Sequence, residues 1–347
     1  KNIHLQKANA LFFPLMILLI GISNLFVIYI GGTQYINGEI QFGTIIEFML
    51  YVNILTWPVA VVGWVTSMVQ QAEASQARIN EFLKEIPEIQ NTNTFSSELN
   101  GNVTFKNVTF TYDDTNITAL KNISFSVKSG ETLAILGKTG SGKSTIIELI
   151  SRLYDTKIGS VLLDEIPIKE VNLNAVRSQI GFVPQDPFLF SESIEENIKF
   201  GKESATKEEI ISAAKNADVH DNIINFPNGY KTILGERGVT LSGGQKQRIS
   251  IARAIIKEPK ILIFDDCLSA VDTETEEKIL SNLEIISKNI TTFIVSHRVS
   301  SAKKADKIIV LNEGEIIQKG THNDLIHIDG YYKSLYEQQL LEKKINL

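Results

Sequence analysis

A glycine-rich segment constrains the fold of this chain more than any other feature. Residues 137–145 read Gly-Lys-Thr-Gly-Ser-Gly-Lys-Ser-Thr, and the apolar run Leu133–Leu136 before them is typical of a buried strand. The pattern G-x-x-x-x-G-K-[ST] is that of a phosphate-binding loop, which lies between a strand and a helix. We therefore expect an α/β domain with a helix that starts near Lys143. Its apolar face would comprise Ile146, Ile147, Leu149, Ile150 and Leu153.

The residues of this loop suit the phosphates of a nucleotide. Glycines let backbone N–H groups turn toward an anion, and the following helix adds unpaired N–H groups and a positive dipole end. Lys143 would reach the β- and γ-phosphates of ATP, and Ser144 would bind Mg²⁺. The strand before and the Lys-Ser ending disfavour the alternative of a chance match. The candidate nucleotide-binding residues are Gly137, Lys138, Thr139, Gly140, Ser141, Gly142, Lys143, Ser144 and Thr145.

A second apolar run is followed by two carboxylates. Ile261–Phe264 precedes Asp265 and Asp266. Open α/β sheets bind ligands at the carboxyl ends of their parallel strands. Asp265 would hold Mg²⁺ there, directly or through water. The alternative is an ordinary turn after a strand, and the phosphate-binding loop favours the metal site.

From about residue 100 to its C-terminus the chain resembles the nucleotide-binding domain of an ABC (ATP-binding cassette) transporter. Seven motifs appear in the order and spacing of that family. They are Tyr112, the Walker A loop at 137–145, the Q-loop Gln185, the signature Leu241–Gln245, the Walker B strand Ile261–Asp265, the D-loop Ser269–Asp272 and the switch histidine His297. The resemblance implies an α/β P-loop NTPase domain. An antiparallel β subdomain is expected near Val103–Val127 and a helical subdomain near Thr206–Ile224, where Thr206 and Glu209 form a candidate capping box.

The resemblance also implies roles for single residues. Tyr112 would stack on adenine, although an aromatic residue at a strand end more often packs against a sheet. Gln185 would contact Mg²⁺ and the attacking water. His297 would hydrogen-bond the γ-phosphate, whereas an isolated histidine after a strand is usually structural. The start of the expected helix 245–256 would bind the γ-phosphate held by a second subunit, through Ser242, Gly243, Gly244 and Gln245.

One residue departs from the family pattern. Hydrolytic members usually carry Glu after the Walker B aspartate, and this chain carries Asp266. The shorter side chain would place its carboxylate about 1 Å from the best position, which can cost roughly a hundredfold in rate. The site is then slow or silent, as in heterodimeric exporters whose partner carries Glu, and the intact signature would serve that partner. The alternative is that Asp266 still acts as the catalytic base through a shifted water.

Two long uncharged runs precede the ATPase-like region. Leu11–Ile30 and Phe48–Gln70 are each long enough to cross a ~30 Å hydrocarbon core. Lysine and arginine residues on their outer flanks place both outer ends in the cytoplasm and the polar stretch Gly31–Gly43 outside. Buried core helices and a signal peptide are the alternatives. The length of the two runs disfavours buried core helices, and the presence of a second run disfavours a signal peptide.

These features predict the domain organisation and the location. Residues 1–72 would form the last two transmembrane helices of an exporter membrane domain, residues 73–100 a cytoplasmic linker, and residues 101–347 the nucleotide-binding domain. Four further spans would precede residue 1. The expected location is the cell membrane, as a multi-pass protein with a cytoplasmic ATPase. A net charge of −6 gives no reason to expect a nucleic-acid partner, and the single Cys267 excludes an intrachain disulfide.

The predicted function is that of an ATP-hydrolysing half of an exporter. ATP and Mg²⁺ would drive association with a second half-transporter, in a homodimer or a heterodimer, and so move a substrate across the lipid bilayer. The sequence does not identify that substrate. A catalytically slow regulatory subunit of a heterodimer is the first alternative. A soluble ABC ATPase clamp that acts in DNA repair or translation is the second, and the two uncharged runs disfavour it.

Overall fold

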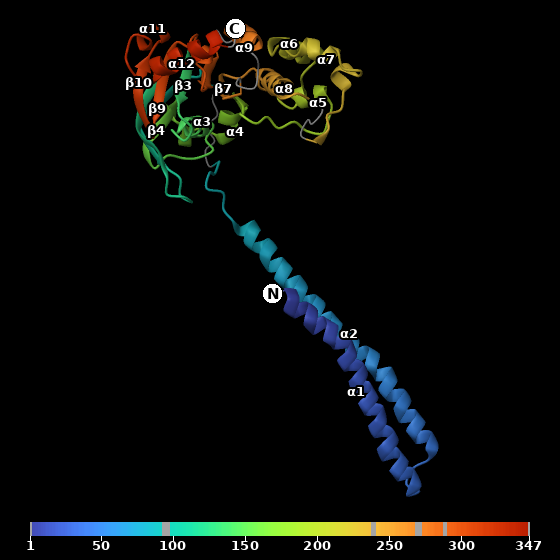
Figure 1. Ribbon diagram of the computed structural model, residues 1–347. Helices are drawn as coiled ribbons and strands as arrows, with labels where there is room; N and C mark the ends of the chain where they lie inside the picture. Colours follow the sequence, from blue (N-terminus) through green and yellow to red (C-terminus); the bar gives the residue numbers. More distant parts are fainter. Residues whose placement is uncertain (1, 92–97, 237–240, 268–272, 287–289, 346–347) are drawn as a thin grey trace. The chain divides into compact units, whose positions relative to one another are not determined.

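The computed structural model describes residues 2–91, 98–236, 241–267, 273–286 and 290–345. The chain divides into two compact units, Lys1–Pro87 and Glu88–Leu347. In Figure 1 the first unit is blue to cyan, and the second continues through green and yellow to red.

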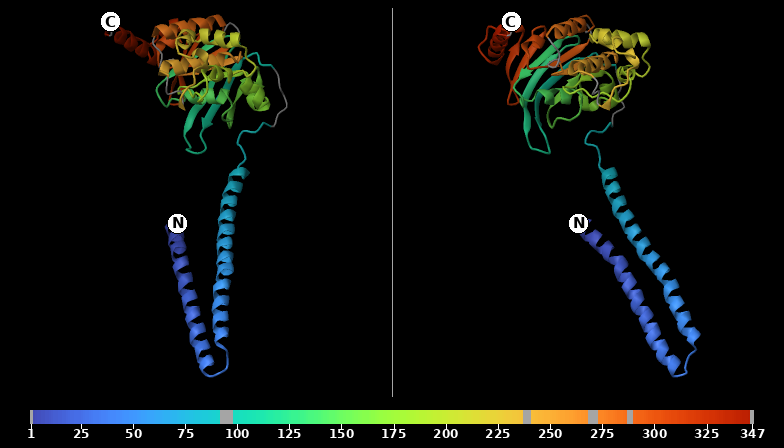
Figure 2. Two further views of the ribbon diagram at one scale, coloured as in Figure 1. Left: turned by 90° about the vertical axis from the view of Figure 1, so that its right-hand side faces the viewer. Right: turned by 45° about the vertical axis from the view of Figure 1, so that its right-hand side comes forward.

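Unit 1 is a hairpin of two long helices, α1 (Asn2–Ile36) and α2 (Phe42–Lys84), which lie side by side in both views of Figure 2. At 35 and 43 residues, both exceed the ~20 residues that a membrane span needs. Each contains a proline, Pro14 or Pro58. Most of their described large apolar side chains are exposed, so the segments Pro14–Ile36 and Phe42–Lys84 are candidate membrane spans.

The connection between α1 and α2 is shorter than the sequence predicts. A loop is expected over Gly31–Gly43, but α1 continues to Ile36 and α2 begins at Phe42. Packing explains why glycine is accommodated in the last turns of α1. A Cβ atom at Gly31 would lie 3.0 Å from Cγ1 of Ile45, so glycine lets the two helices approach closely.

Unit 2 is built on two sheets. In its described part, a four-stranded antiparallel sheet has the order β2-β1-β4-β5, and a six-stranded sheet has the order β10-β9-β3-β8-β7-β6. The five strands from β9 to β6 are parallel, and β10 pairs antiparallel with β9 at one edge. The strands are β1 (Val103–Thr111), β2 (Thr118–Val127), β3 (Thr132–Gly137), β4 (Ile158–Leu163), β5 (Ile166–Pro167), β6 (Ile180–Val183), β7 (Ile261–Asp265), β8 (Thr291–Val295), β9 (Lys307–Asn312) and β10 (Glu315–Gly320).

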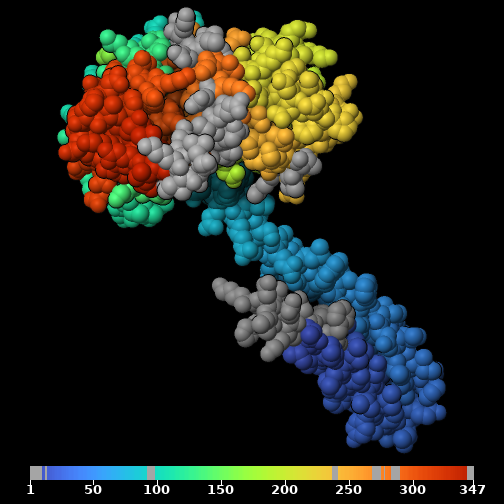
Figure 3. Space-filling view, turned by 45° about the horizontal axis from the view of Figure 1, so that its top comes forward, coloured from blue at the N-terminus to red at the C-terminus, as the bar shows by residue number. Residues whose placement is uncertain are grey.

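Helices surround these sheets. They are α3 (Lys143–Ile150), η1 (Ile168–Glu170), α4 (Leu173–Ser178), α5 (Ile194–Lys199), α6 (Lys207–Asn216), α7 (His220–Ile224), η2 (Gly229–Lys231), α8 (Gly243–Ile255), α9 (Thr273–Ile286), α10 (Val299–Ala302), α11 (His322–Leu325) and α12 (Tyr331–Ile345). The predicted capping box at Thr206 and Glu209 is present at the start of α6. In Figure 3 the C-terminal segment (red) and the helical region around α6 and α7 (yellow) lie on opposite sides of unit 2.

The fold class is confirmed. Two candidate membrane helices precede an α/β domain with an antiparallel sheet and a helical region. The central strands are apolar runs because both faces of the parallel sheet are covered, and all five residues of β8 are buried. Three clusters of buried side chains form the core, one between the sheets, one under α6 and α8, and one under α12.

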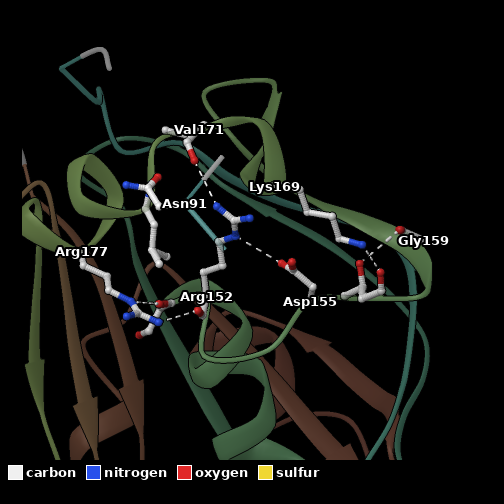
Figure 4. A network of polar contacts seen from close by, with 10 residues as sticks. Asn91, Arg152, Asp155, Gly159, Lys169, Val171 and Arg177 are labelled. Carbon is white, nitrogen blue, oxygen red and sulfur yellow. Dashed lines mark hydrogen bonds and ion pairs between the residues drawn. The ribbon is translucent and has the colours of Figure 1, made fainter. Parts of the chain in front are cut away.

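The chain reverses sharply after α3. The helix ends at Ile150, and Arg152 has a left-handed backbone with φ 48°. The Arg152 side chain is 4% exposed, donates to the carbonyl of Val171 at 3.1 Å and pairs with Asp155 at 3.3 Å (Figure 4). The expectation that Leu153 extends the apolar face of α3 is therefore wrong, because the turn leaves Leu153 49% exposed.

Candidate functional site

The strand order of the six-stranded sheet brings distant polar residues together. The glycine-rich loop follows β3, His297 follows β8, Asp265 ends β7 and Gln185 follows β6. These four strands are neighbours in the sheet and run parallel, so their carboxyl ends meet at one edge. Segments separated by more than a hundred residues thus contribute to a single site.

A cavity of about 600 Å³ lies at this edge. Its walls come from both sheets, from the start of α3 and from the turn between β9 and β10. The lining residues are Tyr112, Ile117, Thr118, Ala119, Lys121, Thr139, Gly140, Gly142, Lys143, Ser144, Thr145, Gln185, Asp265, Asp266, Val295, His297, Glu313 and Gly314. Most of the predicted nucleotide and metal residues therefore share one cavity.

The glycine-rich loop curls around the Lys143 ammonium group. Its Nζ atom donates to the carbonyl of Gly137 at 2.9 Å and to that of Lys138 at 2.8 Å. Lys143 is only 6% exposed, and burial lowers its pKa, while Asp266 and Asp265 oppose this effect. The loop thus holds a positive charge at the start of α3, beside the unpaired N–H groups of the helix.

Two carboxylates face this charge. Burial raises the pKa of Asp265, and the negative charges of Asp266 and Glu148 add to the effect, while Lys143 lowers it. Asp266 has a left-handed backbone with φ 45°, and its N–H donates to the carbonyl of Val295 at 2.9 Å. A cation bound by the carboxylates would relieve the repulsion between Asp265 and Asp266.

Tyr112 links the antiparallel sheet to α3. Its hydroxyl lies 2.9 Å from Oγ1 of Thr145 and donates to the carboxylate of Glu148, also at 2.9 Å. Burial raises the pKa of Tyr112 to about 12. The Tyr112 ring contacts Phe110 and Tyr154 edge to face. Tyr112 is therefore both a packing residue and a wall of the cavity.

The signature lies at the N-terminus of α8 and not in the cavity wall. Ser242 and Gln245 form a capping box. The Ser242 hydroxyl accepts a hydrogen bond from the Gln245 N–H at 3.3 Å, and the Gln245 side chain accepts one from the Ser242 N–H at 3.0 Å. Ser242 and Gly243 are exposed, and Gly244 is half-buried. In the same helix, the buried Gln247 side chain donates to the Gln185 carbonyl at 2.6 Å and so ties α8 to the Q-loop.

Three residues of the glycine-rich loop do not line the cavity. Gly137 is buried against the carbonyl of Leu311, Lys138 is exposed, and the Ser141 side chain is 3% exposed. The D-loop Ser269–Asp272 lies outside the described residues.

The sequence interpretation missed one wall of the cavity. Ala119, Lys121, Glu313 and Gly314 lie there, on β2 and on the turn between β9 and β10. The Gly314 N–H donates to the Ser141 carbonyl at 3.2 Å, and the Lys121 N–H donates to the Gly314 carbonyl at 2.8 Å. No local motif marks these residues, since contacts between segments far apart in the sequence bring them to the loop.

The cavity fits a nucleotide with a magnesium ion. In the described part of the chain, no group of three or more His, Cys, Asp or Glu side chains could hold a metal ion by itself. Mg²⁺ at nucleotide sites, however, uses one or two carboxylates together with phosphate oxygens and waters. Ser144, Gln185 and Asp265 carry side-chain oxygen atoms and line the same cavity as the loop.

Comparisons with known proteins show which family this chain resembles. Residues 120–269 match the family model described as ABC transporter. The chain is 43% identical over 326 residues to an uncharacterized ABC transporter ATP-binding protein, YfiB, of Bacillus subtilis, covering 94% of this chain and 56% of the relative. It is 40% identical to the multidrug resistance-like ATP-binding protein MdlA of Escherichia coli, covering 100% and 59%.

A solved structure matches both units of the chain. It is that of a bacterial Atm1-family ABC exporter with ATP bound, with a TM-score of 0.79 and 35% identity, covering 96% of this chain and 58% of the exporter chain. The chain spans little more than half the length of these relatives. The domain at 120–269 is a nucleotide-binding domain. The similarity to membrane exporters, together with the two candidate spans of unit 1, places the protein in a membrane.

Proposed function

Since its ATP-binding domain places this chain in the ABC transporter family, we propose that it is part of an ATP-driven exporter. ATP with Mg²⁺ would bind in the cavity at the carboxyl ends of β3, β6, β7 and β8. The observation that carries this proposal is the meeting of Lys143, Asp265, Gln185 and His297 in that cavity. The Atm1-family exporter with ATP bound supports the choice of nucleotide.

Each side chain has a separate task in this proposal. Lys143 and the N–H groups at the start of α3 would neutralise the phosphates. Mg²⁺ would be held by Ser144, Asp265 and Gln185. When bound, the ion would neutralise charge that develops on the transferred phosphoryl group. Asp266 would orient the attacking water and accept its proton, and His297 would donate a hydrogen bond to the γ-phosphate. The Tyr112 ring would contact the base.

A second subunit would complete the site. The signature residues at the N-terminus of α8 do not line the cavity, and Ser242 and Gly243 are exposed there, so this helix end can meet a nucleotide held by another copy or a partner. Association of two ATP-binding domains around nucleotide would then drive the membrane helices. The chain covers 56–59% of the two relatives described above, so the exported substrate, the partner and the multi-pass topology with a cytoplasmic ATPase are parts of this proposal.

A slow regulatory half of a heterodimer is the second candidate. Asp266 favours it, because a carboxylate one methylene shorter than glutamate positions water less well. A partner with glutamate at this position would then carry most of the hydrolysis. A soluble ATPase clamp is disfavoured because two long apolar helices form unit 1.

Replacing Lys143 tests the proposal. Lys143→Ala removes the ammonium group at the centre of the loop, and we expect the affinity for ATP, measured by calorimetry, to fall at least about tenfold, since hydrogen bonds to charged groups contribute ~1.5–3 kcal/mol each. Lys157→Ala is the matched control, because Lys157 is exposed and pairs with Asp113, and neither residue lines the cavity. Equal ATP affinity in Lys143→Ala and the wild-type protein would refute the nucleotide site.

A further inference from the structure

The segment that carries His297 is held from two sides by side chains of other helices. It leaves β8 at Val295 and enters the short helix α10 at Val299. Arg298 is the N-cap residue of α10, yet its side chain makes no capping hydrogen bond. The first N–H groups of a helix have no partner inside the helix, so a group from elsewhere has to satisfy them.

Gln339 of α12 supplies that group. Its Oε1 atom accepts from the Val299 N–H at 2.8 Å, and its Nε2 atom donates to the His297 carbonyl at 2.9 Å. One carboxamide therefore bonds to the backbone on both sides of Arg298. These two bonds restrict the backbone angles that aim the His297 side chain into the cavity. Val299 is 3% exposed, so water does not readily replace the amide at its N–H.

Glu276 of α9 holds the other side of the same segment. It is fully buried, pairs with Arg298 at 3.3 Å and accepts hydrogen bonds from the hydroxyls of Ser300 and Ser301. Arg298 is partly exposed, but the Glu276 carboxylate is buried, so removing its partners is costly because its charge stays buried. The His297 segment thus has one anchor on α9 and one on α12, and Gln339 is the anchor that bonds to His297 itself.

The C-terminal helix is itself fixed in the core. Tyr332 is fully buried in the cluster with Leu325 and Val310, and its hydroxyl lies 2.7 Å from Nδ1 of His322. Leu335 and Tyr336 pack against the same cluster. Gln339 follows one turn later, so the packing of α12 sets the position of its carboxamide.

We infer that Gln339 is a positioning residue for His297, through which the C-terminal helix α12 controls recognition of the γ-phosphate. This inference rests on the proposed function, because it requires His297 to contact ATP. ADP has no γ-phosphate, so loss of the Gln339 bonds weakens binding of ATP and leaves binding of ADP unchanged. Binding is measured at equilibrium, so the test does not depend on how well Asp266 supports hydrolysis.

The test compares ATP and ADP affinities by calorimetry on the whole purified protein, in the wild type and in Gln339→Leu, with Mg²⁺ present. Gln339→Leu keeps the size of the side chain and removes both hydrogen bonds. We expect the ratio of ADP to ATP dissociation constants to fall by about threefold to tenfold, as expected for a misaligned hydrogen bond to a charged group. Gln339→Glu keeps the acceptor for Val299, and we expect it to lower the ratio less. Glu337→Gln, an exposed position on the same helix, is the control with an unchanged ratio.

A double-variant cycle with His297→Ala separates positioning from general structural support. In the His297→Ala background, Gln339→Leu should change the ratio of ADP to ATP dissociation constants by less than about twofold, since the imidazole that Gln339 positions is gone. If Gln339→Leu weakened ATP and ADP binding equally, or changed neither, the ratio of the ADP to ATP dissociation constants would stay the same and the inference would be overturned. A wild-type protein that binds neither nucleotide would refute the proposed function, and with it the inference. If the wild-type protein bound ATP but His297→Ala left the ratio of dissociation constants unchanged, the inference would be overturned and the proposed function would stand.

Discussion

Gly142, at the end of the phosphate-binding loop, occupies a position that only glycine fits. Its φ angle is 98°, and a Cβ atom there would lie 2.5 Å from the carbonyl oxygen of Ala119. The left-handed region costs other residues ~1–2 kcal/mol, and the steric clash adds to this cost. Gly140 also has a positive φ of 79°, but no heavy atom lies within 4 Å of its Cβ direction.

We therefore expect alanine substitutions at Gly142 and Gly140 to have different effects on stability and ATP binding. Gly142→Ala should lower the free energy of unfolding by more than about 2 kcal/mol and abolish ATP binding, because the loop has to move away from β2. Gly140→Ala should cost only about 1 kcal/mol. Chemical denaturation and calorimetry measure the two effects. Equal stability losses in the two variants would show that the contact with Ala119 has no effect.

Asp266 combines an unusual backbone with an unusual side chain. Its φ of 45° lies in the left-handed region, where aspartate and asparagine are several-fold enriched over most other residues. Asp266→Glu extends the carboxylate and should raise ATPase activity tenfold or more, which corresponds to a barrier lowered by ~1–3 kcal/mol. Asp266→Gln is the matched control, since it has the same length and backbone cost without the charge.

The same assay distinguishes the two candidate functions at this residue. Steady-state ATPase measurements on the whole protein in lipid should show little change in Asp266→Asn if the native site is already slow. Robust turnover in a homodimer, lost in Asp266→Asn, would contradict the slow-site interpretation. It would also remove the main reason to expect a distinct partner subunit.

At the scale of single elements, the N-terminus of α8 has a capping box and a proposed second role in binding nucleotide. Its capping box of Ser242 and Gln245 closes the helix, and the same N-terminus would receive a nucleotide from a second subunit. Helix α6 provides a comparison, because Thr206 and Glu209 form the same capping box there, away from the cavity. A capping role and a nucleotide-binding role can therefore be separated.

Removing each cap should separate these two roles. Ser242→Ala and Thr206→Ala should each reduce stability by ~1 kcal/mol, since each removes one N-cap hydroxyl. Only Ser242→Ala should also weaken the ATP-dependent association of two ATP-binding domains, measured by light scattering or crosslinking. If both variants weakened association equally, the signature would be only a helix cap.

At the scale of the whole molecule, the proposed orientation of unit 1 is testable. A cysteine at Gln34, near the end of α1, should react with an impermeant thiol reagent added to intact cells, and a cysteine at Ser75 should not. The native Cys267 is buried, and burial raises its thiol pKa, so it contributes little background labelling. Labelling of Ser75→Cys alone would reverse the proposed orientation.

Local patterns in the sequence predict much of this protein. The loop at 137–145, the strand before Asp265, the capping box at Thr206 and the two apolar helices each depend on neighbours in the chain, because period, capping and backbone permissiveness are local properties. The roles proposed for Lys143, Asp265 and His297 rest on their residue types together with the family resemblance, and they stay predictions. The length of the α1–α2 connection and the end of α3 at Ile150 did not follow, because contacts between segments decide them.

Tertiary structure alone decided how these segments meet. The order β9-β3-β8-β7-β6 brings four strand ends into one cavity, and contact between the two sheets adds Ala119, Lys121 and Gly314 to its wall. It also places Gln339 against the His297 segment, 42 residues away in the sequence. Such contacts depend on the free energy of the whole packed domain, and the sequence of either segment alone carries no signal for them.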